Sequence, residues 1–177
     1  RTSPLGLLAI SSAIALVGLI ILSTATGFMI FIAATIYGLG KTFFWPTMLG
    51  VAGERFPRGG ALTLNAITGV GMLAAGVFGT AFLGNIQDKQ IDSQLQKQNP
   101  AIHAQVMGQQ QTSVFGKYNP LDQEKVSDLS SSDQAIIAEV QTASKKGALS
   151  TVAVFPGIML ICYLGMISYF RSRGGYK

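Results

Sequence analysis

The chain has little of what catalytic and metal sites are built from. Its 177 residues include one histidine, His103, and one cysteine, Cys162. Cys162 lies in an apolar run and His103 has no second histidine or cysteine near it, so no disulfide framework or metal site can be assembled. No Ser–His–Asp constellation is present. We therefore assign no catalytic residue, no metal ligand and no cofactor, and we expect no enzymatic activity.

Charge is also scarce, and it is segregated along the chain. Charged residues make up 12% of the sequence, against about 25% in a typical globular domain. Residues 2–53 contain one charge and residues 59–87 and 147–170 contain none, whereas residues 88–146 contain thirteen. Hydrophobic residues account for 49% of the chain. This pattern excludes an ordinary soluble fold and predicts an integral membrane protein.

Four segments are long and apolar enough to cross a bilayer, which takes about 20 residues of helix. We predict an all-α integral membrane fold with four transmembrane helices and a polar external helical insert. Residues 1–86 would hold three of these helices. The predicted spans are about 5–22, 28–53, 61–86 and 148–170, with the insert at 87–147 and a basic tail at 171–177.

Basic residues flank the spans at alternating ends along the sequence. If consecutive spans form antiparallel hairpins, these ends lie on the same side of the membrane. They are Arg1, Arg55, Arg58, Arg171, Arg173 and Lys177. The positive-inside rule places both ends of the chain and the 54–60 loop in the cytoplasm, and the insert 87–147 outside the cell membrane. Because this topology accounts for the net charge of +5, we expect a lipid bilayer and no nucleic acid as a partner.

The insert has apolar residues at helical spacing between turn signals. Ile91 precedes Leu95 by four positions, and Ile102 precedes Val106 by the same step. A third face carries Ile136, Ile137 and Val140, with Ser132 or Asp133 as the predicted N-cap. We expect short amphipathic helices that form a small external cap, a solvated lid in preference to a binding domain.

Lys41 is the one charge in the first two spans, and burying an ammonium there costs roughly 2.5–3.5 kcal/mol. On a helical wheel it shares a face with Tyr37 and Trp45. This face is a candidate cavity wall, where Lys41 could bind an anionic or hydroxyl-rich solute, pair with a carboxylate or exchange protons. The alternative is a structural ion pair between helices. Asn65 in the third span is either a cavity residue or an interhelical hydrogen-bond partner.

Helix-breaking residues surround Lys41. Pro46 cannot donate a hydrogen bond to the carbonyl of Thr42 and should kink or break the second span, while Gly38 and Gly40 loosen the preceding turn. Gly40-Lys41-Thr42 also imitates the end of a phosphate-binding loop. That motif needs a glycine at position 35, which is threonine, and a water-exposed turn. We reject nucleotide binding on both grounds.

Three stretches resemble the C-terminal part of a major facilitator superfamily transporter. They are YGLGKTFFWPTMLG at 37–50, ERFPRGGALTLN at 54–65 and FRSRGGYK at 170–177. The resemblance implies spans nine to twelve of a secondary transporter, such as a symporter, that moves a small solute by alternating access. The eight preceding spans, the solute and a coupling proton or cation would be the partners.

The same resemblance implies roles for individual residues. Lys41 and Tyr37 would line the solute path, and Glu54, Arg55 and Arg58 would form a cytoplasmic gate or, equally, a solvated loop that sets topology. Two features depart from the family pattern. The 87–147 insert is longer than usual, and the charged loop expected before the first span is not present. The alternative is a structural or accessory four-helix subunit whose Lys41 pairs with a partner protein.

Overall fold

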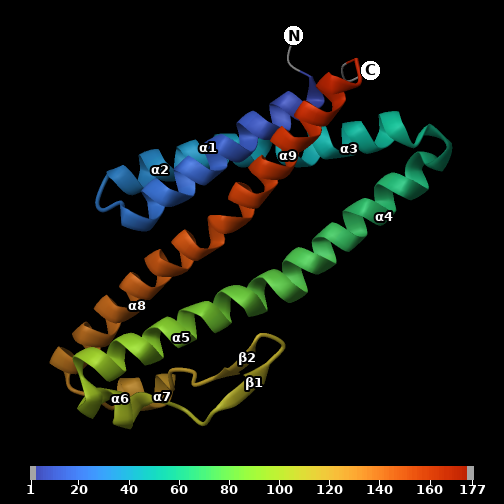
Figure 1. Ribbon diagram of the computed structural model, residues 1–177. Coiled ribbons are helices and arrows are strands. Elements are labelled where there is room, and N and C mark those ends of the chain that lie inside the picture. The colour runs from blue at the N-terminus through green and yellow to red at the C-terminus, as the bar shows by residue number, and fades with distance from the viewer. Residues whose placement is uncertain (1–2, 175–177) are drawn as a thin grey trace. The chain divides into compact units, whose positions relative to one another are not determined.

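A serine cap and a proline start the first helix. The computed structural model describes residues 3–174 and consists mainly of helices (Figure 1). Helix α1 spans Pro4–Thr24. The Ser3 side chain accepts a hydrogen bond from the Gly6 nitrogen at 3.1 Å. Pro4 lacks an N–H, but it lies at the start of the helix, where a backbone N–H has no hydrogen-bond partner within the helix. Arg1 and Lys177, which we used to predict topology, lie outside the described residues.

The second apolar segment is two helices and not one. Helix α2 spans Met29–Thr42 and α3 spans Phe44–Arg55, and they meet at Phe43. Pro46 lies in the first turn of α3, where a proline is tolerated. The carbonyl of Thr42 is the group that Pro46 cannot reach with a hydrogen bond, which gives a physical reason for the end of α2 at that residue.

The third and fourth apolar segments extend as helix well beyond their apolar parts. A 3-10 turn η1 at Pro57–Gly59 leads into α4 (Gly60–Leu73), a π-helical stretch η2 (Ala74–Gly79) and α5 (Thr80–Gln98). Helix α8 spans Ser131–Val152 and α9 spans Val154–Ser172. The predicted boundaries at 86/87 and 147/148 therefore fall inside helices. A helix satisfies its backbone internally, so it can continue from an apolar into a polar environment.

Within residues 3–174, three helical stretches are long and apolar enough to cross a membrane. They are Pro4–Thr24, Pro57–Gln98 and Ser131–Ser172. The predicted second span does not meet the same length criterion, because α2 has 14 residues and α3 has 12. The architecture is thus all-α with helices that could cross a membrane, and the second of the four predicted segments is broken in its middle.

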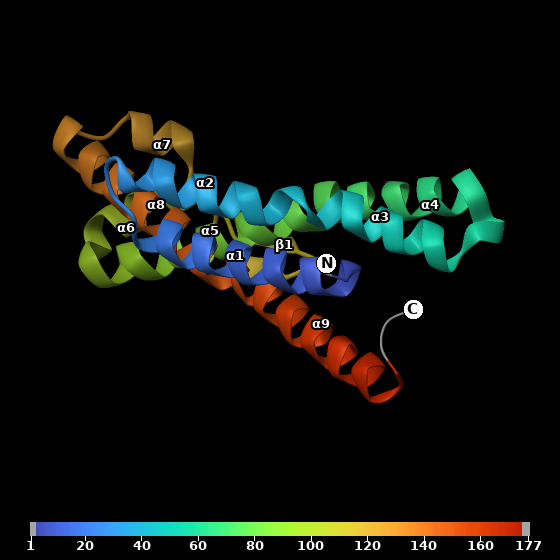
Figure 2. The same cartoon turned by 90° about the horizontal axis from the view of Figure 1, so that it is seen from above.

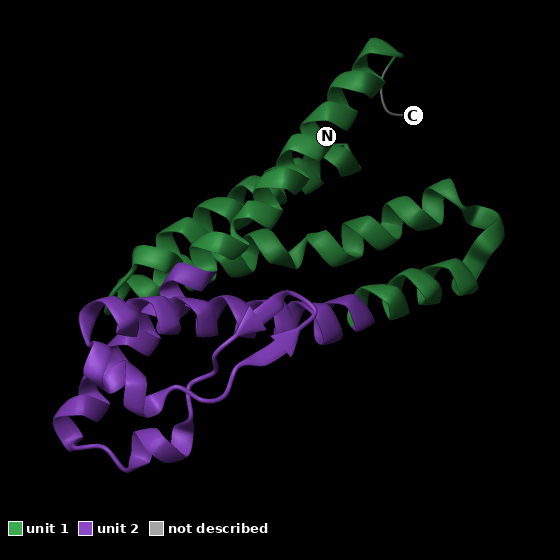
Figure 3. Cartoon of the chain, turned by 60° about the horizontal axis from the view of Figure 1, so that its bottom comes forward, with its two compact units in different colours: residues 1–72, 149–177 green, residues 73–148 purple. Residues whose placement is uncertain are grey.

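The chain divides into two compact units, and each is described by itself. Unit 1 comprises residues 1–72 and 149–177, and unit 2 comprises residues 73–148 (Figure 3). In unit 1, α1 packs against α2 and α9 (Figure 2). Helix α2 runs antiparallel to α1, since Gly18 meets Tyr37 and Ala15 meets Gly40.

The end of α3 and the end of α9 lie at the same end of unit 1. The guanidinium carbon of Arg55 stands 5.7 Å from the centre of the Phe170 ring. Helix α9 also runs antiparallel to α1 (Figures 1 and 2), and Leu16 in the second half of α1 lies near Gly157 at the start of α9. The first residues of α1 and the last residues of α9 therefore share that end.

Unit 2 is organised around one apolar core. The core consists of the residues that the helical spacing had placed on amphipathic faces: Ile91, Leu95, Ile102, Val106, Ile137 and Val140. They come from α5, from α6 (Pro100–Val106) and from α8. The short helix α7 spans Gln123–Ser127. Helix α8 is capped by Ser130, whose Oγ accepts from the Asp133 nitrogen at 3.3 Å, slightly earlier than the predicted Ser132 or Asp133.

A β-hairpin in unit 2 was not expected from the sequence. Strand β1 (Gln111–Ser113) pairs antiparallel with β2 (Gly116–Tyr118). Gly116 has a φ of 105°, a left-handed conformation that only glycine adopts without strain. The hairpin is held to α5 by Asn85, whose Nδ2 donates to the Ser113 Oγ at 3.0 Å, and by an edge-to-face contact of Phe82 with Phe115.

Candidate functional site

Lys41 is an exposed residue of α2 next to the residues that contact α1. Ala33 and Gly40 are buried on the α1 side, whereas Lys41 is exposed on this chain. Its Nζ lies 6.0 Å from the centre of the Tyr37 ring, within the range of a cation–π attraction. Two of the three residues that the helical wheel grouped are therefore neighbours in the structure.

Trp45, the third residue of that group, is turned toward α4. A Cβ atom at Gly71 would lie 3.1 Å from the Cη2 atom of the Trp45 ring. The absence of a side chain at Gly71 therefore leaves room for the indole. The Trp45 side chain retains 39% exposure, and it joins α3 to α4 within unit 1. Sequence reasoning missed this contact, because the spacing between residues 45 and 71 carries no periodic signal.

The charge of Lys41 has no carboxylate beside it in the part of the chain that the structure describes. Ion pairs are formed by His103 with Asp92 at 2.6 Å and by Lys125 with Asp122 at 3.6 Å. Both belong to unit 2. An ammonium in an apolar segment is tolerated where it faces water, a ligand or a partner group, and the exposure of Lys41 leaves it available to such a group.

The residues proposed as a hinge have different surroundings. Gly40 is buried, and a Cβ atom there would lie 2.5 Å from the Ala15 nitrogen, so its small size serves close packing of α2 on α1. Gly38 has nothing within 4 Å of its Cβ position. Pro46 lies just after the break at Phe43. From the sequence we predicted that Gly40 loosens a helical turn. The structure shows that it also allows α2 to pack closely on α1.

Asn65 is exposed on α4, and among residues 3–174 its side chain makes no hydrogen bond. The predicted interhelical hydrogen bond is therefore not made among these residues, and the cavity role stays a prediction. Glu54 and Arg58 are exposed on either side of the α3–η1 turn. Arg55, Arg58 and the residues between them line a shallow hollow of about 300 Å³. Arg55 is placed against α9 through Phe170.

His103 has a partner that its isolation in the sequence did not indicate. Its Nε2 lies 2.6 Å from one oxygen of Asp92, and the other oxygen accepts a hydrogen bond from the Asn119 Nδ2 at 3.3 Å. This network joins α5, α6 and the segment after β2. Because it holds three backbone segments together, we assign it a structural role.

No protein-family model, curated protein or solved structure matches the chain. The transporter resemblance therefore rests on the residues of the three stretches quoted above, and the function is argued from the geometry around Lys41.

Proposed function

We propose that this chain supplies the last four spans of a secondary transporter of the major facilitator type, which moves a small solute across the cell membrane by alternating access. The observation that carries the proposal is the position of Lys41. It is an exposed ammonium in an apolar segment, it lies near the Tyr37 ring, and it precedes the α2–α3 break by two residues.

The broken helix supports a transport role on physical grounds. Together α2 and α3 cover residues 29–55, long enough to cross a bilayer as one interrupted span. Broken helices at membrane depth occur where the freed backbone groups line a cavity. Lys41 would lie on such a cavity wall and attract an anionic or hydroxyl-rich solute, or a carboxylate through which a coupling proton moves.

Charge placement supports a topology for this proposal. Arg55 and the end of α9, which carries Arg171 and Arg173, lie at one end of unit 1. Basic residues near span ends favour the cytoplasm. We place this end inside the cell, with Glu54, Arg55 and Arg58 at a cytoplasmic gate, and the 87–147 insert outside.

A second candidate is favoured by the missing carboxylate near Lys41. Among the described residues none lies within 4.0 Å of its Nζ. A structural or accessory membrane subunit would use such a lysine to pair with an acidic group on a partner protein. In that case Lys41 would be covered by protein and would not meet water.

Thiol accessibility separates the two candidates without knowledge of the solute. In a Cys162→Ser background of the complete protein, Lys41→Cys is treated with a membrane-impermeant methanethiosulfonate reagent. The matched control is Leu39→Cys, whose native side chain is 58% exposed on another face of α2. A solute path predicts rapid modification at position 41 and little at position 39. If the reagent modifies neither position, the result would favour the accessory-subunit hypothesis and contradict the transporter hypothesis.

A further inference from the structure

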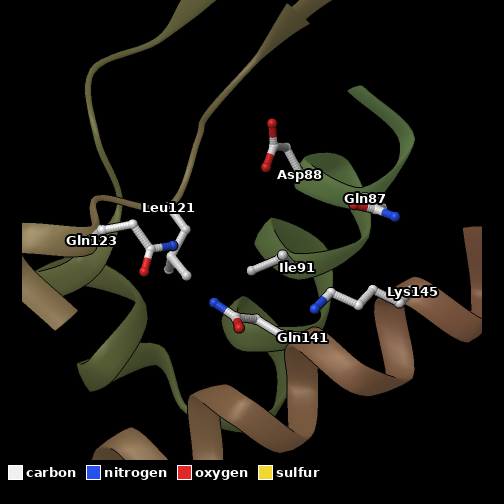
Figure 4. Close-up of a pocket in the computed structure, with 7 residues that line it drawn as sticks. All are labelled: Gln87, Asp88, Ile91, Leu121, Gln123, Gln141 and Lys145. Atoms are coloured by element: carbon white, nitrogen blue, oxygen red, sulfur yellow. The ribbon is translucent and has the colours of Figure 1, made fainter. Parts of the chain in front are cut away.

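Unit 2 contains a polar cavity that the Lys41 site does not involve. It has a volume of about 240 Å³ and is lined by residues of three segments (Figure 4). Helix α5 contributes Gln87, Asp88 and Ile91, and α8 contributes Gln141 and Lys145. Gln123 is the first residue of α7, and Leu121 lies in the segment before it.

The two charged groups of this cavity have opposite signs and do not pair with each other. The ion pairs of the described residues involve neither Asp88 nor Lys145, so more than 4.0 Å separates the carboxylate from the ammonium. Burial raises the pKa of the Asp88 carboxyl above its ordinary value, since desolvation disfavours the charged form. A cationic partner would relieve this cost.

The remaining lining residues divide into amides and an apolar floor. Three glutamine side chains supply both donors and acceptors of hydrogen bonds. Ile91 is 7% exposed and belongs to the apolar core of unit 2, which fixes the floor of the cavity. The lining is thus mainly polar, with Ile91 and Leu121 as its apolar part.

We propose that this cavity binds a small zwitterion of amino-acid size, with its ammonium toward Asp88 and its carboxylate toward Lys145. The glutamine amides would hydrogen-bond its polar groups, and Ile91 and Leu121 would contact its aliphatic part. The inference goes beyond transport and does not rest on it, because all the lining residues belong to unit 2.

Charge and size select this class of ligand. The lining carries one negative and one positive group. A ligand with only a positive charge would be repelled by Lys145, and one with only a negative charge would be repelled by Asp88. A molecule with both charges satisfies both groups. The volume of about 240 Å³ lies below the range of about 300–1,000 Å³ typical of drug-sized ligands, which restricts the site to a small molecule.

The test is isothermal titration of the complete protein in lipid nanodiscs with L-alanine and L-glutamine as probes. Butylamine and butyrate, which carry one charge each, are the comparison ligands. We expect at least one amino acid to bind, and each singly charged ligand to bind about tenfold more weakly or worse, as expected for the loss of one charge-assisted hydrogen bond.

Variants locate the binding in the cavity. Asp88→Asn and Lys145→Gln should each weaken amino-acid binding about tenfold, whereas Lys145→Arg should preserve it within a few-fold. The matched controls are Asp128→Asn and Lys117→Gln, which remove the same charges from exposed positions of unit 2. Hydrogen exchange around the Ile91 core verifies that each variant folds. No amino-acid binding, equal binding of butyrate, or unchanged binding in both cavity variants would overturn the proposal.

Discussion

The backbone of Gly40 in α2 lies directly against the backbone of Ala15 in α1. A Cβ atom at Gly40 would stand 2.5 Å from the Ala15 nitrogen, and one at Gly18 would stand 2.6 Å from the Tyr37 nitrogen. One glycine from each helix therefore allows the close approach, as small residues do at helix interfaces in membranes. The contact also fixes the rotation of α2, which leaves Lys41 exposed.

Substituting Gly40 with alanine should separate the two helices. The new methyl group meets backbone atoms that cannot rotate aside, and overpacking of this kind costs about 1–3 kcal/mol. We expect a lower midpoint of thermal unfolding in detergent for Gly40→Ala. The matched control is Gly38→Ala, where the Cβ position has nothing within 4 Å and helix propensity favours alanine. Equal stability of the two variants would show that the contact contributes nothing.

Trp45 is the chain's single tryptophan, so its fluorescence reports the contact with Gly71. In Gly71→Ala the added Cβ would lie 3.1 Å from the ring, and the indole must move outward. We expect a shift of the emission maximum and a change in quenching by iodide. Gly69→Ala, whose Cβ position has nothing within 4 Å, should leave the spectrum unchanged. Identical spectra for both variants would place Trp45 away from α4.

Lys41→Met should abolish solute uptake in cells that express the complete protein, while membrane insertion and abundance stay unchanged. The substitution removes the ammonium and keeps a side chain of similar length, so the helix packing is preserved. Lys97→Met removes an exposed lysine of unit 2 and should retain uptake. The measurement is accumulation of radiolabelled candidate solutes. Undiminished uptake in Lys41→Met would reduce Lys41 to a structural role.

Asp88 should make unit 2 less stable as pH rises through the acid range. Burial raises the pKa of its carboxyl above the ordinary value of 3.8, so the folded state holds the proton after the unfolded state has lost it. Stability therefore falls as pH rises from 3.8 to the folded pKa, and the loss persists above it. At neutral pH, unit 2 of Asp88→Asn should have a larger free energy of unfolding than that of the wild type. At about pH 3 the two free energies should be equal. Hydrogen exchange of unit 2 measures this difference.

Much of the secondary structure could be predicted from local patterns. The lack of charge in residues 59–87 and 147–170 indicated apolar helices, and these segments are helical. The spacing of Ile91 with Leu95 and of Ile102 with Val106 indicated apolar faces, and these side chains form one core. The ends of the helices were not predictable in the same way, because α5 and α8 continue through a change from apolar to polar composition.

The candidate site was only partly predictable for a related reason. Helical periodicity grouped Lys41 with Tyr37, since both lie on α2 and are four residues apart. It could not place Trp45 against Gly71, nor Asp88 near Lys145, because these residues are distant in sequence. Gly40 shows the same limit, since a glycine that loosens a turn and one that admits a neighbouring helix look identical in sequence.

The sequence by itself determined the membrane character of the chain, the helical segments and the position of the one charge in the first two spans. These follow from hydropathy, residue spacing and the missing N–H of Pro46, which act over a few turns of helix. The tertiary structure decided which face of α2 meets α1, where Trp45 packs and which side chains surround the unit 2 cavity. Such contacts depend on the shapes of surfaces brought together by folding, and local residue patterns do not encode them.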